Sequence, residues 1–155
     1  MSLFKRFFIP GQEKVHEVPD DDIPPSRRKL LMLDDDKSLT NILKEVLATH
    51  NYDVTVVSGG AEGIKHVMAA DFDVILCDMV MPGFPGDMFY RAVERTKPHL
   101  CKRFIFMTGH RGDTKIDEFI RSVKGLMLWK PFEIPQLMDA IRVIEKKAGQ
   151  PATVA

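Results

Sequence analysis

Five short apolar runs, separated by longer amphipathic stretches, constrain the fold of this chain more than any other feature. The runs cover residues 30–33, 54–57, 74–77, 104–107 and 126–129. Each run has the length of a buried strand, and each stretch between runs is long enough for a helix. Alternating strands and helices are typical of a parallel sheet built from repeated strand–helix units. We therefore expect an α/β fold with five parallel strands.

Apolar residues between and after the runs recur at helical spacing and predict five helices. We interpret these residues as core. They are Leu39, Ile42, Leu43, Val46 and Leu47; Ile64, Val67 and Met68; Met88, Phe89, Ala92 and Val93; Ile116, Phe119 and Ile120; and Leu137, Met138, Ile141, Val143 and Ile144. With 155 residues and 45% hydrophobic content, the chain has enough apolar material for one domain.

The two ends of the chain lie outside this alternating pattern. Residues 1–27 contain several prolines and an acidic run without a sustained apolar period, so we expect a flexible tail or linker. The domain should occupy residues 28–147. Residues 148–155 should form a flexible C-terminal tail that is too short for an output domain.

The balance of charges argues against several classes of function. Lysine and arginine number 22, as do aspartate and glutamate, so no overall field favours nucleic acid or an anionic membrane. No apolar run approaches the ~18 residues of a membrane span, and no signal-peptide core is present. We expect a cytoplasmic protein without stable membrane insertion, with Cys77 and Cys101 as reduced thiols.

Acidic, hydroxyl and ammonium side chains follow the predicted strands where ligands bind in open parallel sheets. Asp34, Asp35 and Asp36 follow the first strand, Asp78 the third, Thr108 the fourth and Lys130 the fifth. Carboxylates that gather at one sheet edge repel one another unless protons or cations neutralise them. Magnesium suits such hard oxygen ligands, so the charges imply a Mg²⁺ site.

A carboxylate beside Mg²⁺ has a further use, because aspartate can act as a nucleophile toward phosphorus. Phosphoryl transfer then depends mainly on positioning and on neutralising the phosphoryl oxygens. Mg²⁺ can take one oxygen, Lys130 another, and the Thr108 hydroxyl or a nearby amide the third. The residues therefore suit phosphoryl transfer to Asp78.

Four fragments in order resemble the response-regulator receiver domain of two-component signalling. They are Leu33-Asp34-Asp35-Asp36, Asp78-Met79-Val80-Met81-Pro82-Gly83 with Gly86, Met107-Thr108-Gly109, and Trp129-Lys130-Pro131-Phe132. The resemblance covers residues 28–147. It implies a flavodoxin-like (βα)5 doubly wound sheet with the strand order 2-1-3-4-5.

The resemblance also implies roles for the residues at the site. Asp78 is similar to the residue that accepts a phosphoryl group from a sensor histidine kinase or a histidine phosphotransfer protein. Asp34, Asp35, Asp78 and the Val80 carbonyl resemble the ligands of Mg²⁺. Lys130 and Thr108 resemble the groups that contact the phosphoryl oxygens, and Pro131 should follow a cis peptide. Such a protein signals to a downstream protein, here unknown, and is not an enzyme beyond slow reactions with its own phosphoryl group.

The chain departs from many receivers near this site. Met127 stands where they have an aromatic residue that moves with the threonine, so the aromatic form of the switch is not expected. We expect Trp129 to pack in the core or against a helix. Val80 and His110 stand where family members vary the access of water to the phosphate, and we hypothesise that they slow hydrolysis.

Other interpretations lead to different functions. Asp34, Asp36 and Ser38 also resemble the opening motif of haloacid-dehalogenase-type phosphatases, with Asp34 as nucleophile and Asp36 as acid/base residue. No further acidic pair follows Lys130, which counts against that enzyme. A pseudo-receiver that only binds proteins is a third possibility, although all five site groups are present. Asp36 or Ser38 is expected to cap the first helix. The chain is either a receiver that acts alone or a fragment of a larger kinase or regulator.

Overall fold

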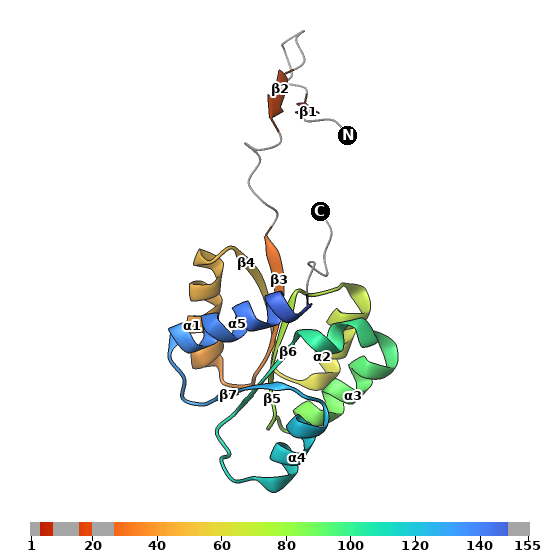
Figure 1. Cartoon of the computed structure of the whole chain (residues 1–155), viewed down its shortest axis with the longest axis vertical. Coiled ribbons are helices and arrows are strands. Elements are labelled where there is room, and N and C mark those ends of the chain that lie inside the picture. Colours follow the sequence, from red (N-terminus) through yellow and green to blue (C-terminus); the bar gives the residue numbers. More distant parts are fainter. Residues whose placement is uncertain (1–3, 8–15, 20–26, 149–155) are drawn as a thin grey trace.

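The computed structural model describes residues 4–7, 16–19 and 27–148, and its main feature is a five-stranded parallel sheet. The strands lie in the order β4-β3-β5-β6-β7 (Figure 1). Counted along the sheet's own strands, this order is 2-1-3-4-5, so the flavodoxin-like fold is confirmed. The strands are β3 (Arg28–Leu33), β4 (Tyr52–Val57), β5 (Val74–Asp78), β6 (Phe104–Thr108) and β7 (Leu126–Trp129).

Helices cover both faces of the sheet and form the two outer layers of the domain (Figure 1). Helices α1 and α5 pack on one face, and α2, α3 and α4 pack on the other. A 3₁₀ helix, η2 (Pro98–Arg103), leads from α3 into β6. The α-helices are α1 (Lys37–Thr49), α2 (Gly60–Ala69), α3 (Gly86–Thr96), α4 (Thr114–Ser122) and α5 (Ile134–Ala148).

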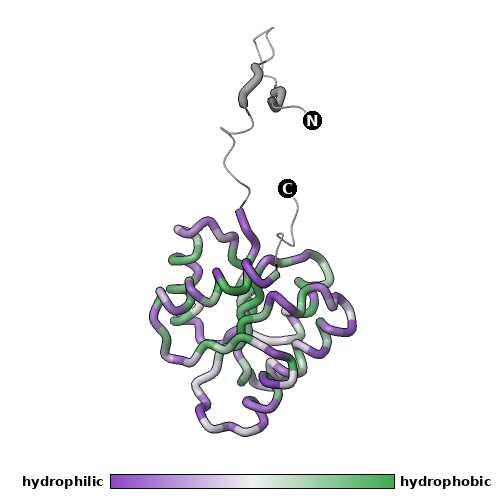
Figure 2. Tube along the Cα trace, viewed as in Figure 1, coloured by the Kyte–Doolittle hydropathy of each residue, from purple (hydrophilic) through white to green (hydrophobic). Residues whose placement is uncertain are grey.

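Alternation along the central strands divides the core into two clusters. In β3, Leu31 and Leu33 face α2, α3 and α4, whereas Leu30 and Met32 face α1 and α5. All four side chains are fully buried. Successive strand residues point to opposite faces, so a strand covered on both sides must be apolar throughout. The hydrophobic colouring accordingly concentrates along the central strands (Figure 2).

Four residues that the helical spacing assigned to the core are exposed instead. Ile42, Met68, Met88 and Val143 have exposed fractions of 58%, 57%, 51% and 50%. Only a limited arc of each helix faces the sheet, and a residue next to that arc can share the apolar pattern without being covered. The core interpretation was wrong at these positions.

Two short strands near the start of the chain form a separate sheet. Strand β1 (Phe4–Phe7) pairs antiparallel with β2 (His16–Pro19). The apolar pattern did not predict this pairing. The interpretation of residues 1–27 as a tail or linker falls mostly outside the described residues and stays a prediction. The tail expected at residues 148–155 is wrong at Ala148, which belongs to a helix, and stays a prediction for residues 149–155, which lie outside the described residues. Helix α5 ends at Ala148, one residue beyond the expected domain boundary.

Candidate functional site

Strand register brings the polar residues at or just after the ends of four strands to one edge of the sheet. Leu33 of β3 is level with Cys77 of β5, which places Asp34 beside Asp78. Asp78 is level with Met107 of β6, and Thr108 is level with Trp129 of β7. The edge therefore carries residues 34, 78, 108 and 130 together, although they lie far apart in the sequence.

Three carboxylates form a cluster at this edge. Asp34, Asp35 and Asp78 each offer an oxygen, and the three oxygens lie within 4.8 Å of one another. Asp34 and Asp78 are buried, with exposed fractions of 2% and 6%, whereas Asp35 is exposed. Within the described residues this is the one group of three or more potential metal ligands. Two of its members have little water to stabilise their charge.

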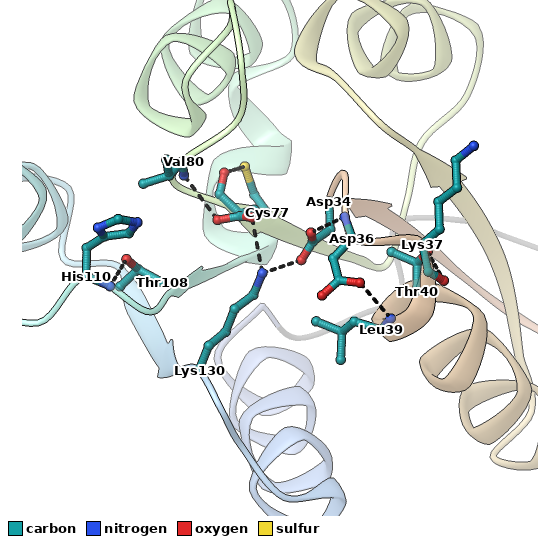
Figure 3. Close-up of polar contacts among 11 residues, drawn as sticks. Asp34, Asp36, Lys37, Leu39, Thr40, Cys77, Val80, Thr108, His110 and Lys130 are labelled. Atoms are coloured by element: carbon teal, nitrogen blue, oxygen red, sulfur yellow. Dashed lines mark hydrogen bonds and ion pairs between the residues drawn. The ribbon is translucent and has the colours of Figure 1, made fainter.

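Lys130 joins the two buried carboxylates. Its Nζ donates to Asp34 Oδ2 at 2.5 Å and to Asp78 Oδ2 at 3.1 Å, and Figure 3 shows the ammonium directed toward Asp34. Burial opposes the charged form of Lys130, but the hydrogen bond to Asp34 and the charges of both carboxylates outweigh it and raise the pKa of the ammonium. Lys130 is therefore a fixed positive charge at the site.

Asp78 lies at the end of β5 with its carboxylate held from two directions. The Val80 amide donates to Asp78 Oδ1 at 3.0 Å, while Lys130 holds Oδ2. Burial raises the pKa of Asp78, and the neighbouring charge of Asp34 adds to the rise; the Val80 amide and Lys130 counteract it only in part. The negative charge of the ionised Asp78 carboxylate is therefore only partly compensated by its neighbours.

The chain between β5 and α3 requires glycine at a close backbone approach. A Cβ at Gly86 would lie 2.5 Å from the Asp78 carbonyl oxygen and 2.9 Å from Met79 Cα. The Gly86 amide donates to the Met79 carbonyl at 3.1 Å, which closes the loop. Gly83 within it has a φ of 76°, a conformation that glycine adopts without steric cost. These glycines fix the loop that carries Val80 beside Asp78.

Thr108 ends β6 with its hydroxyl facing the following loop. Its Oγ1 accepts a hydrogen bond from the His110 amide at 3.0 Å (Figure 3). Its carbonyl accepts one from the Lys130 amide at 2.8 Å. The side chain is fully buried. Thr108 therefore shares the edge with the acidic cluster, but its recorded hydrogen bonds run to the β6–α4 loop and to β7.

Asp36 has a structural role that the sequence predicted. It is the N-cap of α1, and its Oδ1 accepts from the Leu39 amide at 3.2 Å (Figure 3). Its own amide donates to Asp34 Oδ1 at 2.9 Å. The phosphatase interpretation needs Asp36 as acid/base residue, and this arrangement commits its carboxylate to the helix instead.

The surroundings of Lys130 include one expected and one unexpected feature. The Lys130–Pro131 peptide bond is cis, as the resemblance implied. Trp129 is only partly buried and belongs to neither core cluster. The Arg111 guanidinium lies over its ring, 4.7 Å from the centroid. The expectation of core packing for Trp129 was wrong, and a loop arginine lies over the ring instead; packing against a helix stays a prediction. Sequence spacing gives no signal for the Arg111 contact.

The donor set at the acidic cluster fits a magnesium ion. Mg²⁺ binds oxygen at about 2.1 Å, so two ligands on one ion lie at most about 4.2 Å apart. The three carboxylate oxygens are already gathered to nearly this spread. Residues Asp34, Asp35 and Asp78 would hold the ion, with water filling the remaining positions as Mg²⁺ usually requires.

Comparison with known proteins identifies the family. The fold and the acidic edge define a doubly wound α/β protein with a site at the carboxyl ends of its strands. Residues 30–142 match the family model of the response regulator receiver domain. The chain belongs to this family. Receivers of two-component systems pair with histidine kinases and typically signal rather than catalyse, and an acidic triad like that of Asp34, Asp35 and Asp78 is typical of their Mg²⁺ site.

Individual relatives are distant. The transcriptional regulatory protein ResD of Bacillus subtilis is 24% identical over 122 residues, which cover 79% of this chain and 50% of ResD. The response regulator protein FleR of Pseudomonas aeruginosa is 25% identical over 113 residues, or 73% of this chain and 24% of FleR. The chain thus spans half or less of these curated relatives.

Solved structures share the fold. A CheY-like response regulator receiver domain protein from Methanospirillum hungatei superposes with a TM-score of 0.72 at 20% identity, covering 79% of this chain and 97% of that one. Among the residues that the structure describes, none of the helices is long and apolar enough to cross a membrane.

Proposed function

We propose that this chain is a phospho-acceptor whose Asp78 takes a phosphoryl group from a phosphohistidine on a sensor histidine kinase or a histidine phosphotransfer protein. One observation carries the proposal. Asp78 lies within a three-carboxylate cluster and its Oδ2 accepts a hydrogen bond from Lys130, so a nucleophile, a candidate metal site and a fixed cation share one edge. Membership of the receiver family supports the same role.

The reaction needs little covalent chemistry from the protein. An Asp78 carboxylate oxygen forms a bond to phosphorus as the bond from phosphorus to the donor histidine nitrogen breaks. The electron pair leaves with the imidazole, which takes up a proton from water. The signal ends by hydrolysis. Water attacks phosphorus, the bond from phosphorus to Asp78 breaks, and inorganic phosphate leaves while the carboxylate is restored.

The residues around Asp78 would stabilise the transferred group by charge and position. The Lys130 ammonium, which bonds Asp78 Oδ2, is placed to contact one phosphoryl oxygen. The Thr108 hydroxyl would give up its hydrogen bond with the His110 amide and donate to another phosphoryl oxygen instead. Mg²⁺ bound by Asp34, Asp35, Asp78 and the Val80 carbonyl would neutralise negative charge on the phosphoryl group.

The loss of the hydrogen bond between Thr108 and His110 would link the state of the site to the surface of the protein. The Thr108 hydroxyl now anchors the start of the β6–α4 loop through His110, and Arg111 two residues after Gly109 covers Trp129. A phosphoryl group that engages Thr108 would release this loop and shift the population of α4 positions. Amide hydrogen exchange with a phosphate mimic should change between His110 and Phe119; unchanged exchange there would contradict the switch.

Two neighbours of the site bear on how long the phosphoryl group lasts. Val80 is 44% exposed beside Asp78, and His110 is exposed at the start of the opposite loop. Side chains on either side of the phosphoryl group would obstruct the line along which water attacks phosphorus. We therefore propose that they prolong the phosphorylated state.

Intact-mass analysis after incubation with acetyl phosphate and Mg²⁺ tests the phospho-acceptor role. Wild type should gain one phosphoryl mass, and Asp78→Asn should gain none. Asp36→Asn is the matched control, because Asp36 is a neighbouring carboxylate that caps α1, and it should be phosphorylated like wild type. A haloacid-dehalogenase-type phosphatase would depend on Asp34 and Asp36 instead, and a pseudo-receiver would gain no mass.

A further inference from the structure

A cavity at the opposite end of the sheet from Asp78 is not used by the proposed phosphoryl transfer. It has a volume of about 340 Å³ and opens where β6 and β7 begin. Phe104 and Leu126 are the first residues of these strands, and Asp78 is the last residue of β5. The cavity is therefore separated from the acidic edge by the length of the sheet.

The floor of this cavity is apolar. It is lined by Phe104, Phe106, Val123, Leu126 and Ile144, which come from β6, β7, α5 and the end of α4. Gly125 also belongs to the lining, and a Cβ there would lie 2.6 Å from the Phe106 ring. The missing side chain keeps this wall open. An apolar floor of this size suits one or two large side chains of a partner.

The rim of the cavity carries positive charge. Lys102 of η2, Lys124 after α4 and Lys147 of α5 all line it, and none of the carboxylate residues that the structure describes does. All three lysines are exposed, and none forms an ion pair with another residue in the described part of the chain. Lys147 Nζ donates to the Lys124 carbonyl at 3.4 Å, which brings two of the rim segments together. Glu94 acts electrostatically on Cys101 of the lining and bonds Arg91.

We propose that this cavity docks a partner protein through an acidic segment that inserts an aromatic or aliphatic side chain between flanking carboxylates. The charge pattern favours this occupant, because the three ammonium groups come from three separate segments around an apolar floor. Carboxylates on either side of an apolar anchor match that arrangement better than one compact anion. Rim charges of this kind steer association, and the buried anchor supplies most of the affinity.

The cavity wall also touches the helix that follows the candidate switch loop. Tyr90 and Phe106 line the cavity, and each packs edge-on against Phe119 of α4, with ring centroids 5.5 Å apart in both pairs. A displacement of α4 would thus change the packing of the cavity wall. Any dependence of docking on phosphorylation rests on the proposed function, whereas docking itself does not.

Amide chemical shifts of the ¹⁵N-labelled full chain test the docking surface without phosphate or Mg²⁺. The probe is a synthetic acetylated and amidated pentapeptide with the sequence Glu-Asp-Phe-Asp-Glu. Saturable shifts should appear at Val123, Lys124, Gly125 and Leu126. Two control peptides, one with alanine for phenylalanine and one with lysine for every acidic residue, should bind at least fivefold more weakly. Equal binding of either control, or no shift at these four amides, overturns the proposal.

Charge reversal on α5 separates the cavity from general charge attraction. Lys147 lines the cavity, whereas Lys146 is equally exposed on the same helix and does not. Lys147→Glu should weaken peptide binding at least fivefold, and Lys146→Glu should leave it within twofold of wild type. Equal losses in both variants overturn the proposal, as do concentration-dependent shifts of the cavity amides without peptide, which would show a second copy as the occupant. Docking that succeeds in a protein that acetyl phosphate does not phosphorylate would contradict the proposed function alone.

Discussion

The Lys130 ammonium lies 2.5 Å from Asp34 Oδ2, and the Asp34 side chain has no exposed surface. A carboxylate without water is stable only when a partner compensates its charge. Lys130 also forms an ion pair with Asp78 Oδ2 at 3.1 Å. One ammonium thus compensates the charges of two carboxylates that would otherwise repel each other. These two ion pairs link the stability of the fold to the chemistry of the site.

Substitution of Lys130 by methionine should destabilise the protein. The change leaves Asp34 and Asp78 without a cation, and breaking a buried ion pair costs about 3–5 kcal/mol; the one-fifth exposure of Lys130 lowers our expectation to about 2 kcal/mol. Urea unfolding measures the loss. Mg²⁺ should restore part of it, because an ion that binds only the folded state stabilises that state. Lys146→Met, at an exposed position on α5, is the control, and equal stability of the two variants would count against the role of Lys130.

Asp78→Asn should have the opposite effect on stability when Mg²⁺ is absent. Burial raises the pKa of Asp78 in the folded state, so above the unfolded pKa the ionised carboxylate disfavours folding. Asparagine removes that charge and the repulsion from Asp34. The melting temperature should rise by a few degrees, the effect of about 1 kcal/mol in a domain of this size. A lower melting temperature than wild type in a chelator would show that Lys130 already compensates Asp78 fully.

Gly86→Ala should destabilise the loop that carries Val80. The new Cβ would lie 2.5 Å from the Asp78 carbonyl oxygen, and backbone atoms have little freedom to move aside. We expect a loss of about 1–3 kcal/mol in the free energy of unfolding, together with slower phosphorylation by acetyl phosphate. Gly59→Ala is the matched control, because nothing lies within 4 Å of a Cβ there. Similar stabilities for the two variants would show that the loop can adjust.

Alanine at Val80 and His110 should shorten the lifetime of the phosphorylated state. Removal of both side chains would open the approach of water to phosphorus, and we expect hydrolysis to accelerate several-fold. The decay of phosphorylated protein, followed by intact mass after removal of acetyl phosphate, measures the rate. Val143→Ala changes a similarly exposed apolar residue on α5 and should leave the rate unchanged. An unchanged decay rate in the double variant would contradict the proposal that Val80 and His110 shield the phosphoryl group from water.

The sequence predicted the elements that depend on local pattern and on strand topology. Residues that end strands in a parallel sheet must share an edge, so the positions of Asp34, Asp78 and Lys130 followed from the apolar runs that precede them. The helix cap at Asp36 followed from its place before an amphipathic stretch. The strand order came from the resemblance alone, since five apolar runs are compatible with several orders.

The sequence pattern did not predict which side chains neighbouring elements bury, or which distant segments come into contact. Ile42 follows the same helical spacing as Leu43, yet 58% of it is exposed while Leu43 is buried. The Arg111–Trp129 contact joins a loop to a strand end, and no period links the two residues. The cavity rim gathers lysines from η2, α5 and the turn before β7, so only the assembled fold brings them together.

Borohydride trapping tests the central claim most directly, because it reduces an aspartyl phosphate to homoserine at the residue that carried the phosphoryl group. The wild-type chain is treated with acetyl phosphate and Mg²⁺, reduced, digested and sequenced by mass spectrometry. Our account predicts homoserine at position 78 and none at positions 34 or 35. Homoserine at position 34, or none at any of the three positions, would contradict it.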